Sequence, residues 1–151
     1  MTLNAPAFVP ERTPEQPPGT RLLELEARSE VEVIELLEAG LETRSAERLA
    51  QHLGVSLASV LELAGIGNST FHDRKKRGRT LSAEESGRVY RLAKLTEMAE
   101  AYFGDPEAAR RWLGHPKVAL GGRTPLAFGR SAEGAAYVLA LLGRMAHGVI
   151  S

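Results

Sequence analysis

A cluster of basic side chains in the middle of the chain is its clearest candidate for chemistry. Five positive charges lie within six residues, at Arg74, Lys75, Lys76, Arg77 and Arg79. At the end of a recognition helix, such side chains bind the phosphates of a nucleic acid, and this part of the affinity falls as salt rises. The polar side chains before them would lie near base edges: Asn68, Ser69, Thr70, His72 and Asp73. The two hydroxyls and Asn68 could equally bind phosphate oxygens. The alternative is an ordinary solvated helix end, where basic residues interact favourably with the helix dipole.

The segment around this cluster predicts a helix-turn-helix. Residues 56–64 and residues 68–77 form the two predicted helices, and a glycine at position 78 ends the second. Gly65 supplies the turn because it lacks a Cβ atom and so permits a positive φ. Leu61, Ile66 and Phe71 are spaced to fill the wedge between the two helices. This spacing favours DNA binding over a solvated helix end, although helix-turn-helix folds also serve as protein-binding modules.

Helices are also predicted on the N-terminal side of this segment. Many Ala, Leu, Glu and Arg residues and few β-branched residues favour an all-α fold. Ser29 is the predicted N-cap of a helix over residues 29–39, and the alternation of residues 30–34 leaves a strand open as an alternative. Ser45 is the predicted cap of a second helix, which ends at Gly54.

A long helix is predicted to connect the two halves of the chain. Ser82 and Glu85 form a capping box that begins it, and it runs to about residue 103. Its predicted apolar stripe is Val89, Leu92, Leu95, Ala99 and Tyr102. Asp105 then opens a short helix, which a loop over residues 114–130 follows. Ser131 caps the predicted final helix, which runs to about residue 147.

The final helix is apolar on nearly all sides. One face is therefore expected to meet something besides its own small domain, and either packing within the chain or a partner or dimer surface fits the pattern. Trp112, the single tryptophan, is expected to pack in the core. The pair Gly121 and Gly122 does not form a phosphate-binding P-loop, because no strand precedes it and no Lys-Ser/Thr pair follows.

Composition limits the classes of protein that this chain can represent. Its 151 residues suggest one domain or two small domains that share a core. Without cysteine there is neither a disulfide framework nor a thiolate metal site. The four histidines lie far apart and no catalytic motif is visible, so we expect no metal, no cofactor and no enzymatic activity. No secretion signal or apolar run of about 20 residues is visible, so we expect a cytoplasmic protein without a membrane partner.

The zero net charge hides an asymmetry. Residues 1–66 carry 11 acidic and 5 basic residues, a balance of −6, whereas residues 67–151 carry 8 acidic and 14 basic residues, a balance of +6. The total charge therefore does not argue against nucleic acid, because the local field decides.

The chain resembles a known family over residues 31–151, about four fifths of its length. These residues are similar to Xre-type antitoxins with an Xre/MbcA/ParS toxin-binding domain, the partners of RES-type toxins. The helix-turn-helix contributes a generic part of the resemblance. The specific part lies near the C-terminus and comprises Leu120-Gly121-Gly122, Pro125-Leu126, Gly134, Arg144 and Gly148.

The resemblance implies an all-α antitoxin of two parts. We expect a flexible, proline-rich tail over residues 1–20, an Xre-like helix-turn-helix domain over residues 21–81 and a toxin-binding domain over residues 82–151. The first domain would bind operator DNA and repress the protein's own operon. The second would bind and inhibit a cognate RES-type toxin, which consumes NAD. A homodimer is expected, with a higher assembly when the toxin is bound.

The resemblance also implies which residues contact the toxin. They are Arg123, Arg130, Arg144, His147, Gly148, Val149, Ile150 and Ser151. The small C-terminal residues can enter a cleft, and their carboxylate can mimic an anionic group of a substrate. Two positions depart from the family pattern: Arg130 stands where an acidic residue is common, and Ala146 stands where Glu is common. If that Glu pairs with a toxin arginine, this chain must compensate or bind a variant toxin.

Two alternative functions remain open from the sequence. The first is a solitary helix-turn-helix transcription regulator whose C-terminal half only dimerises. The second is an antitoxin that binds protein alone and has lost DNA binding.

Overall fold

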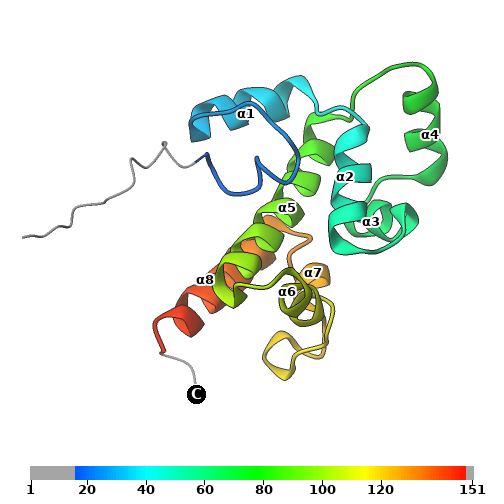
Figure 1. The fold of residues 1–151 in the computed structure, drawn as a ribbon. Coiled ribbons are helices and arrows are strands. Elements are labelled where there is room, and N and C mark those ends of the chain that lie inside the picture. The colour runs from blue at the N-terminus through cyan, green and yellow to red at the C-terminus, as the bar shows by residue number, and fades with distance from the viewer. Residues whose placement is uncertain (1–15, 149–151) are drawn as a thin grey trace, which may run out of the picture.

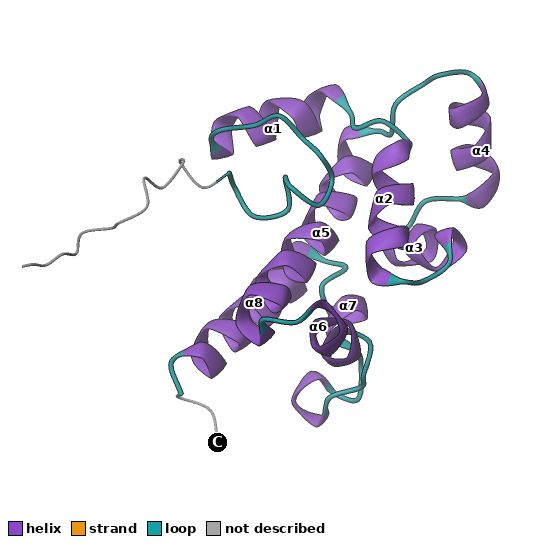
Figure 2. Ribbon diagram, viewed as in Figure 1, coloured by secondary structure: helices purple, strands orange, loops and turns teal. Residues whose placement is uncertain are grey.

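The computed structural model describes residues 16–148, and these residues are helical with connecting loops (Figure 2). In chain order the helices are α1 (Glu30–Ala39), α2 (Arg44–Leu53), α3 (Leu57–Ala64), α4 (Asn68–Lys76), α5 (Ala83–Phe103), α6 (Pro106–Leu113), the 3-10 helix η1 (Val118–Leu120), α7 (Pro125–Phe128) and α8 (Ala132–Ala146). Within the described residues the sole β pairing is an isolated antiparallel bridge between Glu42 and Thr80. This confirms the predicted all-α class. None of the helices in residues 16–148 is both long and apolar enough to span a membrane.

Helix α5 is the centre of the fold. It contacts α1, α2 and α3, and it also contacts α6 and α8 (Figure 1). Ser82 and Glu85 form the predicted capping box at its start, and the helix ends at Phe103 as predicted. The predicted stripe is buried except for Tyr102, which is 38% exposed. Tyr102 instead lies edge-to-face against its neighbour Phe103, with 4.7 Å between ring centroids.

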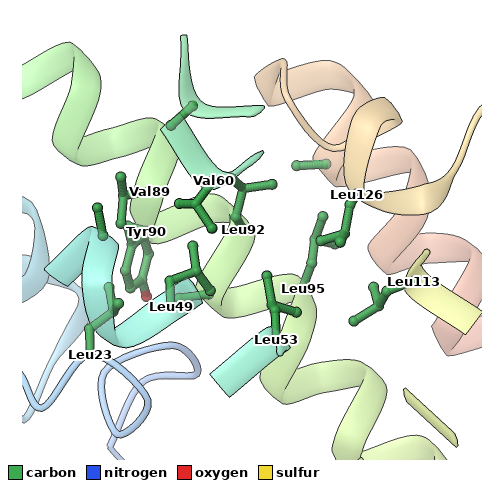
Figure 3. Close-up of a cluster of buried hydrophobic side chains, with 14 of the residues drawn as sticks. Leu23, Leu49, Leu53, Val60, Val89, Tyr90, Leu92, Leu95, Leu113 and Leu126 are labelled. Atoms are coloured by element: carbon green, nitrogen blue, oxygen red, sulfur yellow. The ribbon is translucent and has the colours of Figure 1, made fainter. Parts of the chain in front are cut away.

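The apolar side chains of α5 are covered from two directions. Val89, Tyr90 and Leu92 lie among side chains from the N-terminal half of the chain, and Leu95 lies nearer to those from the C-terminal half (Figure 3). The labelled neighbours are Leu23, Leu49, Leu53 and Val60 on one side and Leu113 and Leu126 on the other. One hydrophobic core therefore joins both halves of the described chain.

The helix-turn-helix forms as the sequence predicts. Ser56 caps α3, and Gly65 adopts a left-handed conformation with φ of 66° between α3 and α4. Leu61, Ile66 and Phe71 are buried together in the core cluster. Buried side chains on both helices fix the angle between them, because interiors of proteins pack without large voids.

Two predictions about the first helices are resolved by the structure. Residues 30–34 are helical, so the strand alternative is wrong, and Ser29 caps α1 by accepting a hydrogen bond from the amide of Glu32. Ser45 is not a cap, because α2 begins one residue earlier, at Arg44, after a turn in which Ser45 donates its amide to the carbonyl of Glu42. Ser45 is instead buried within the first turn of α2.

The described residues before α1 pack against α5. The carboxylate of Glu97 accepts hydrogen bonds from the amides of Gly19 (2.5 Å) and Leu22 (2.6 Å). The hydroxyl of Tyr90 donates to the carbonyl of Pro18 over 2.8 Å, and Thr20 is fully buried. Residues 16–20 were predicted to belong to the flexible tail, whereas in the structure Pro17, Gly19 and Thr20 are buried and Gln16 is exposed. The rest of that predicted tail, residues 1–15, lies outside the described residues.

The segment after α6 is more ordered than the predicted loop. It contains η1 and α7, and Thr124 caps α7 while Pro125 occupies its first turn. Trp112 is partly buried beside the core, with its ring centroid 5.9 Å from that of Phe103. The loop prediction failed here because the two helices are only three and four residues long and lack a periodic pattern.

Helix α8 packs one side against α5 and leaves the other open. Ala135, Val138, Leu141 and Leu142 are buried, whereas Ala136, Tyr137 and Ala140 are exposed. Ser131 is its N-cap, as predicted. The start of α8 approaches α7 so closely that a Cβ atom on Gly134 would overlap the carbonyl oxygen of Phe128.

We predict that Gly134→Ala lowers the free energy of unfolding by about 2 kcal/mol, since overpacking against backbone atoms cannot be relieved by a rotamer change. Gly143→Ala on the same helix is the matched control, because a Cβ there has nothing within 4 Å. It should stabilise the protein by about 0.5–1 kcal/mol through helix propensity. Denaturant unfolding of both variants tests this, and equal effects at the two positions would contradict the steric account.

Candidate functional site

Helix α4 presents a polar surface to solvent. The side chains of Asn68, Ser69, Thr70 and His72 are all exposed, and Phe71 alone anchors this turn of the helix in the core. The ring of His72 lies edge-to-face against Phe71, with 5.4 Å between centroids. Gly67 precedes the helix and makes no side-chain capping bond. The first turn of α4 is therefore open to an incoming ligand, and α4 lies at the periphery of the fold (Figure 1).

Three of the five predicted phosphate-binding residues form ion pairs within the chain. Arg74 pairs with Glu85 at the start of α5, and Lys75 pairs with Glu47 of α2 over 2.8 Å. Arg77 pairs over 3.1 Å with Asp73, which the sequence analysis places near base edges. Lys76 and Arg79 are exposed and have no ion pair within residues 16–148. The field offered by the cluster is therefore weaker than its five charges suggest.

Glu85 has two partners, and one of them, Arg74, holds α4 against α5. Its carboxylate accepts a hydrogen bond from the amide of Ser82 over 2.8 Å and pairs with the guanidinium of Arg74. Burial raises the pKa of Glu85, but the hydrogen bonds from Ser82 and Arg74 outweigh this and hold the pKa below its usual value. Arg74 is only 25% exposed. Its geometry is that of a positioning residue, which holds the recognition helix rather than reaching outward.

The structure brings two predicted toxin-binding arginines to one aromatic pair. The guanidinium of Arg123 lies 4.7 Å from the ring centroid of Phe128, and that of Arg144 lies 5.9 Å from the centroid of Tyr137. Phe128 and Tyr137 are themselves in contact, with 5.5 Å between centroids. Cation–π contacts of this kind orient a guanidinium without neutralising it. We call these four residues the arginine–aromatic row.

Arg130 lies at the opposite end of α8 from Arg144, His147 and Gly148. Arg130 precedes α8 and Arg144 is near its end, so they are separated by about 20 Å along the helix at 1.5 Å per residue. His147 and Gly148 follow α8 and are exposed. Val149, Ile150 and Ser151 lie outside the described residues.

A groove beside the helix-turn-helix contains two arginines that were not among the predicted site residues. Arg88 and Arg91 of α5 line it together with Arg123 and Arg130, and its volume is about 660 Å³. Arg88 and Arg91 are three residues apart on a helix, a spacing that places both on one face and that offered a signal in the sequence. Their meeting with Arg123 and Arg130 depends on the tertiary fold.

The histidines do not gather around a metal. Within residues 16–148 no group of three or more His, Asp or Glu side chains is arranged to hold a metal ion. His52 of α2 instead contacts Glu100 of α5, with 2.5 Å between Nε2 and Oε1. This contact ties α2 to α5.

These features define a helix-turn-helix protein joined to a helical domain with a cationic, solvent-exposed surface. A family model described as the antitoxin Xre-like helix-turn-helix domain matches residues 32–94. A second, described as the antitoxin Xre/MbcA/ParS C-terminal toxin-binding domain, matches residues 98–148. Both matches include part of α5, so the predicted boundary between residues 81 and 82 stays a prediction.

Three similar proteins are named antitoxin Xre. Antitoxin Xre of Pseudomonas putida is 38% identical over 79 residues, which cover 52% of this chain and 50% of that protein. Antitoxin Xre of Yersinia enterocolitica is 33% identical, with 66% of this chain and 70% of that protein covered. Antitoxin Xre of Photorhabdus laumondii is 26% identical over 95% of this chain and 98% of that protein. The chain belongs to the Xre antitoxin family, as the sequence resemblance indicates.

We predict that Arg74→Ala lowers the free energy of unfolding by about 1–2 kcal/mol, because it leaves the half-buried Glu85 without its charged donor. Lys76→Ala should change it by less than about 0.5 kcal/mol, since Lys76 is exposed. The lowered pKa of Glu85 adds stability above its unfolded-state pKa, and this is lost as pH falls through the folded pKa. Urea unfolding should therefore show the difference between the wild type and Arg74→Ala shrinking in acid. A difference that stays constant down to pH 2 would contradict the pairing.

Proposed function

We propose that this antitoxin represses its own operon by binding operator DNA through α4, and that it inhibits a RES-type, NAD-consuming toxin through its C-terminal end. The observation that carries the proposal is the open polar turn of α4, which the buried Phe71 and the Arg74–Glu85 pair hold on the surface. The RES class of the toxin rests on the family resemblance.

The proposed DNA contacts divide into two groups. A recognition helix enters the major groove with its N-terminal residues toward the bases, so Asn68, Ser69, Thr70 and His72 are placed to read base edges. Lys76 and Arg79 are available to bind phosphates directly. Lys75 and Arg77 are also candidates, but each must exchange a carboxylate of its own chain for a phosphate. Arg74 contributes by holding α4 in place.

The proposed toxin contacts lie just before α7, on α8 and after α8. Arg123 and Arg144 of the arginine–aromatic row are exposed and fixed by stacking, so they can meet acidic groups of a toxin with little loss of side-chain entropy. His147, Gly148 and the final three residues would enter the toxin's cleft. Because Ala146 lacks a carboxylate, the arginine–aromatic row is our candidate for the compensating contact.

We also propose that the protein is a homodimer that forms a higher assembly with its toxin. The exposed side of α8, which includes Ala136, Tyr137 and Ala140, offers an apolar face that the described chain does not cover. Light scattering of the free protein and of the toxin complex measures both states.

A growth assay with the neighbouring reading frame tests the toxin proposal. Expressed alone, the neighbour should stop growth and deplete NAD, and co-expression of this antitoxin should restore both. An antitoxin shortened by residues 147–151 should fold and fail to protect. A neighbour that is harmless would favour the solitary regulator, and full protection by the shortened chain would refute the role of the C-terminal end.

For DNA, we predict that the double variant Lys76→Ala, Arg79→Ala binds the operator more weakly and reduces the salt slope by about 2, since each lost phosphate contact removes about 0.9. Toxin neutralisation should be unaffected. Arg111→Ala, which removes an exposed charge on α6, is the matched control. Fluorescence anisotropy at several salt concentrations measures the slope. If wild type and double variant bind alike, Lys76 and Arg79 do not contact phosphate; if even the wild type does not bind, the protein acts on the toxin alone.

A further inference from the structure

The groove with four arginines lies where the two domains of the antitoxin meet. Arg88 and Arg91 come from α5 within the helix-turn-helix match, whereas Arg123 and Arg130 precede α7 and α8 within the toxin-binding match. Phe128 and Ser131 also line it. Neither domain alone contains the whole groove.

The groove carries an excess of positive charge. None of its four arginines takes part in an ion pair within residues 16–148. Two carboxylates are near: Glu84 lines the groove, and Glu133 acts on Arg91 at longer range. Four guanidinium groups and two carboxylates leave a local balance of +2.

Arg91 has an unsatisfied donor and a like-charged neighbour. Its Nε atom is buried and has no hydrogen-bond partner among the described residues. Burial and the neighbouring charge of Arg88 lower the pKa of Arg91, and Glu133 opposes them. A buried donor without an acceptor is costly, and the neighbouring guanidinium groups repel one another, so an anion in the groove would relieve the repulsion.

The donors present match one class of anion. A guanidinium offers a planar fork of N–H donors that fits two oxygens of a phosphate, and several such forks suit a tetrahedral group with more than one negative charge. Ser131 accepts a hydrogen bond from the amide of Gly134 and still has its hydroxyl proton to donate. We propose that this groove is a binding site for a phosphate group.

The position of the groove gives the bound phosphate a structural role. Arg130 and Arg88 lie against Gly65, the turn of the helix-turn-helix; a Cβ on Gly65 would be 3.3 Å from Nη2 of Arg130 and 3.6 Å from Nε of Arg88. Gly65 is two residues before Gly67, the N-cap of α4. A phosphate held by these arginines therefore fixes the base of the recognition helix to the start of α8. The phosphate can belong to the DNA backbone or to a free anion, and both present the same oxygens.

The first experiment uses the full chain and inorganic pyrophosphate. Titration followed by NMR of backbone amides, at constant ionic strength set with chloride, should shift signals of residues around the groove. The variant Arg123→Ala, Arg130→Ala removes two exposed donors and should weaken pyrophosphate binding at least about tenfold, because each charge-assisted bond contributes that much or more. Circular dichroism checks that the variant folds, and Arg111→Ala is the charge-matched control that should bind as the wild type does.

The second experiment identifies the source of the phosphate with a DNA duplex. If the groove holds a backbone phosphate, the double variant binds the duplex with a smaller salt slope and pyrophosphate competes with DNA. If it holds a free anion, the double variant binds DNA as the wild type does while its pyrophosphate shifts are lost. Both results support the site.

Unchanged pyrophosphate binding by the double variant, or shifts that chloride reproduces, would overturn it. So would a variant that loses only toxin neutralisation, since the groove would then be a protein contact; failure of α4 to bind operator would not affect this test.

Discussion

Burial of α5 on more than one side is the constraint on which the rest of the structure depends. A helix with one apolar stripe needs one partner, but α5 carries buried side chains toward both halves of the chain, from Val89 and Leu92 to Leu95 and Ala99. Each half covers part of this surface, and neither can leave without exposing it to water. The two matched domains therefore share a core, and the described chain is expected to unfold as one cooperative unit.

The same helix determines how the functional surfaces are presented. Its first turn holds the recognition helix through Glu85 and Arg74, and its flank supports α8 and so the C-terminal end. Glu85 caps its own helix and also pairs with Arg74, so one carboxylate serves both local and tertiary structure. Part of the basic cluster forms ion pairs within the chain, which leaves fewer of its charges for a nucleic acid. In the proposed DNA complex, specific base contacts by the polar first turn of α4 would therefore contribute a larger share of the affinity than general attraction to phosphate.

Local signals in the sequence were sufficient to predict most of the helices. The wedge of Leu61, Ile66 and Phe71, the capping box at Ser82 and the caps Asp105 and Ser131 depend on neighbours a few residues away, and all are present. What escaped prediction depends on residues distant in the chain. Glu97 holds Gly19 across 78 residues, Glu47 pairs with Lys75 between two helices, and Arg88 meets Arg130 only in the folded protein. The assignments of individual residues to DNA and toxin remain predictions, because contacts with a partner are not encoded in local periodicity.

Close packing among α5, α7 and α8 restricts which residues can occupy some positions and leaves exposed positions free to change. A Cβ on Gly134 would overlap the backbone of Phe128, so geometry alone requires glycine there. A Cβ on Gly129 would overlap the end of the Leu95 side chain, which would have to shift. Arg144 is exposed near the end of α8 and lies outside the proposed phosphate groove, so it bears no such restriction. If Arg144 contacts the toxin as proposed, natural selection can exchange its charge as the toxin diverges, while the scaffold that carries it stays unchanged. Paralogous pairs in one genome could become insulated from one another by this route.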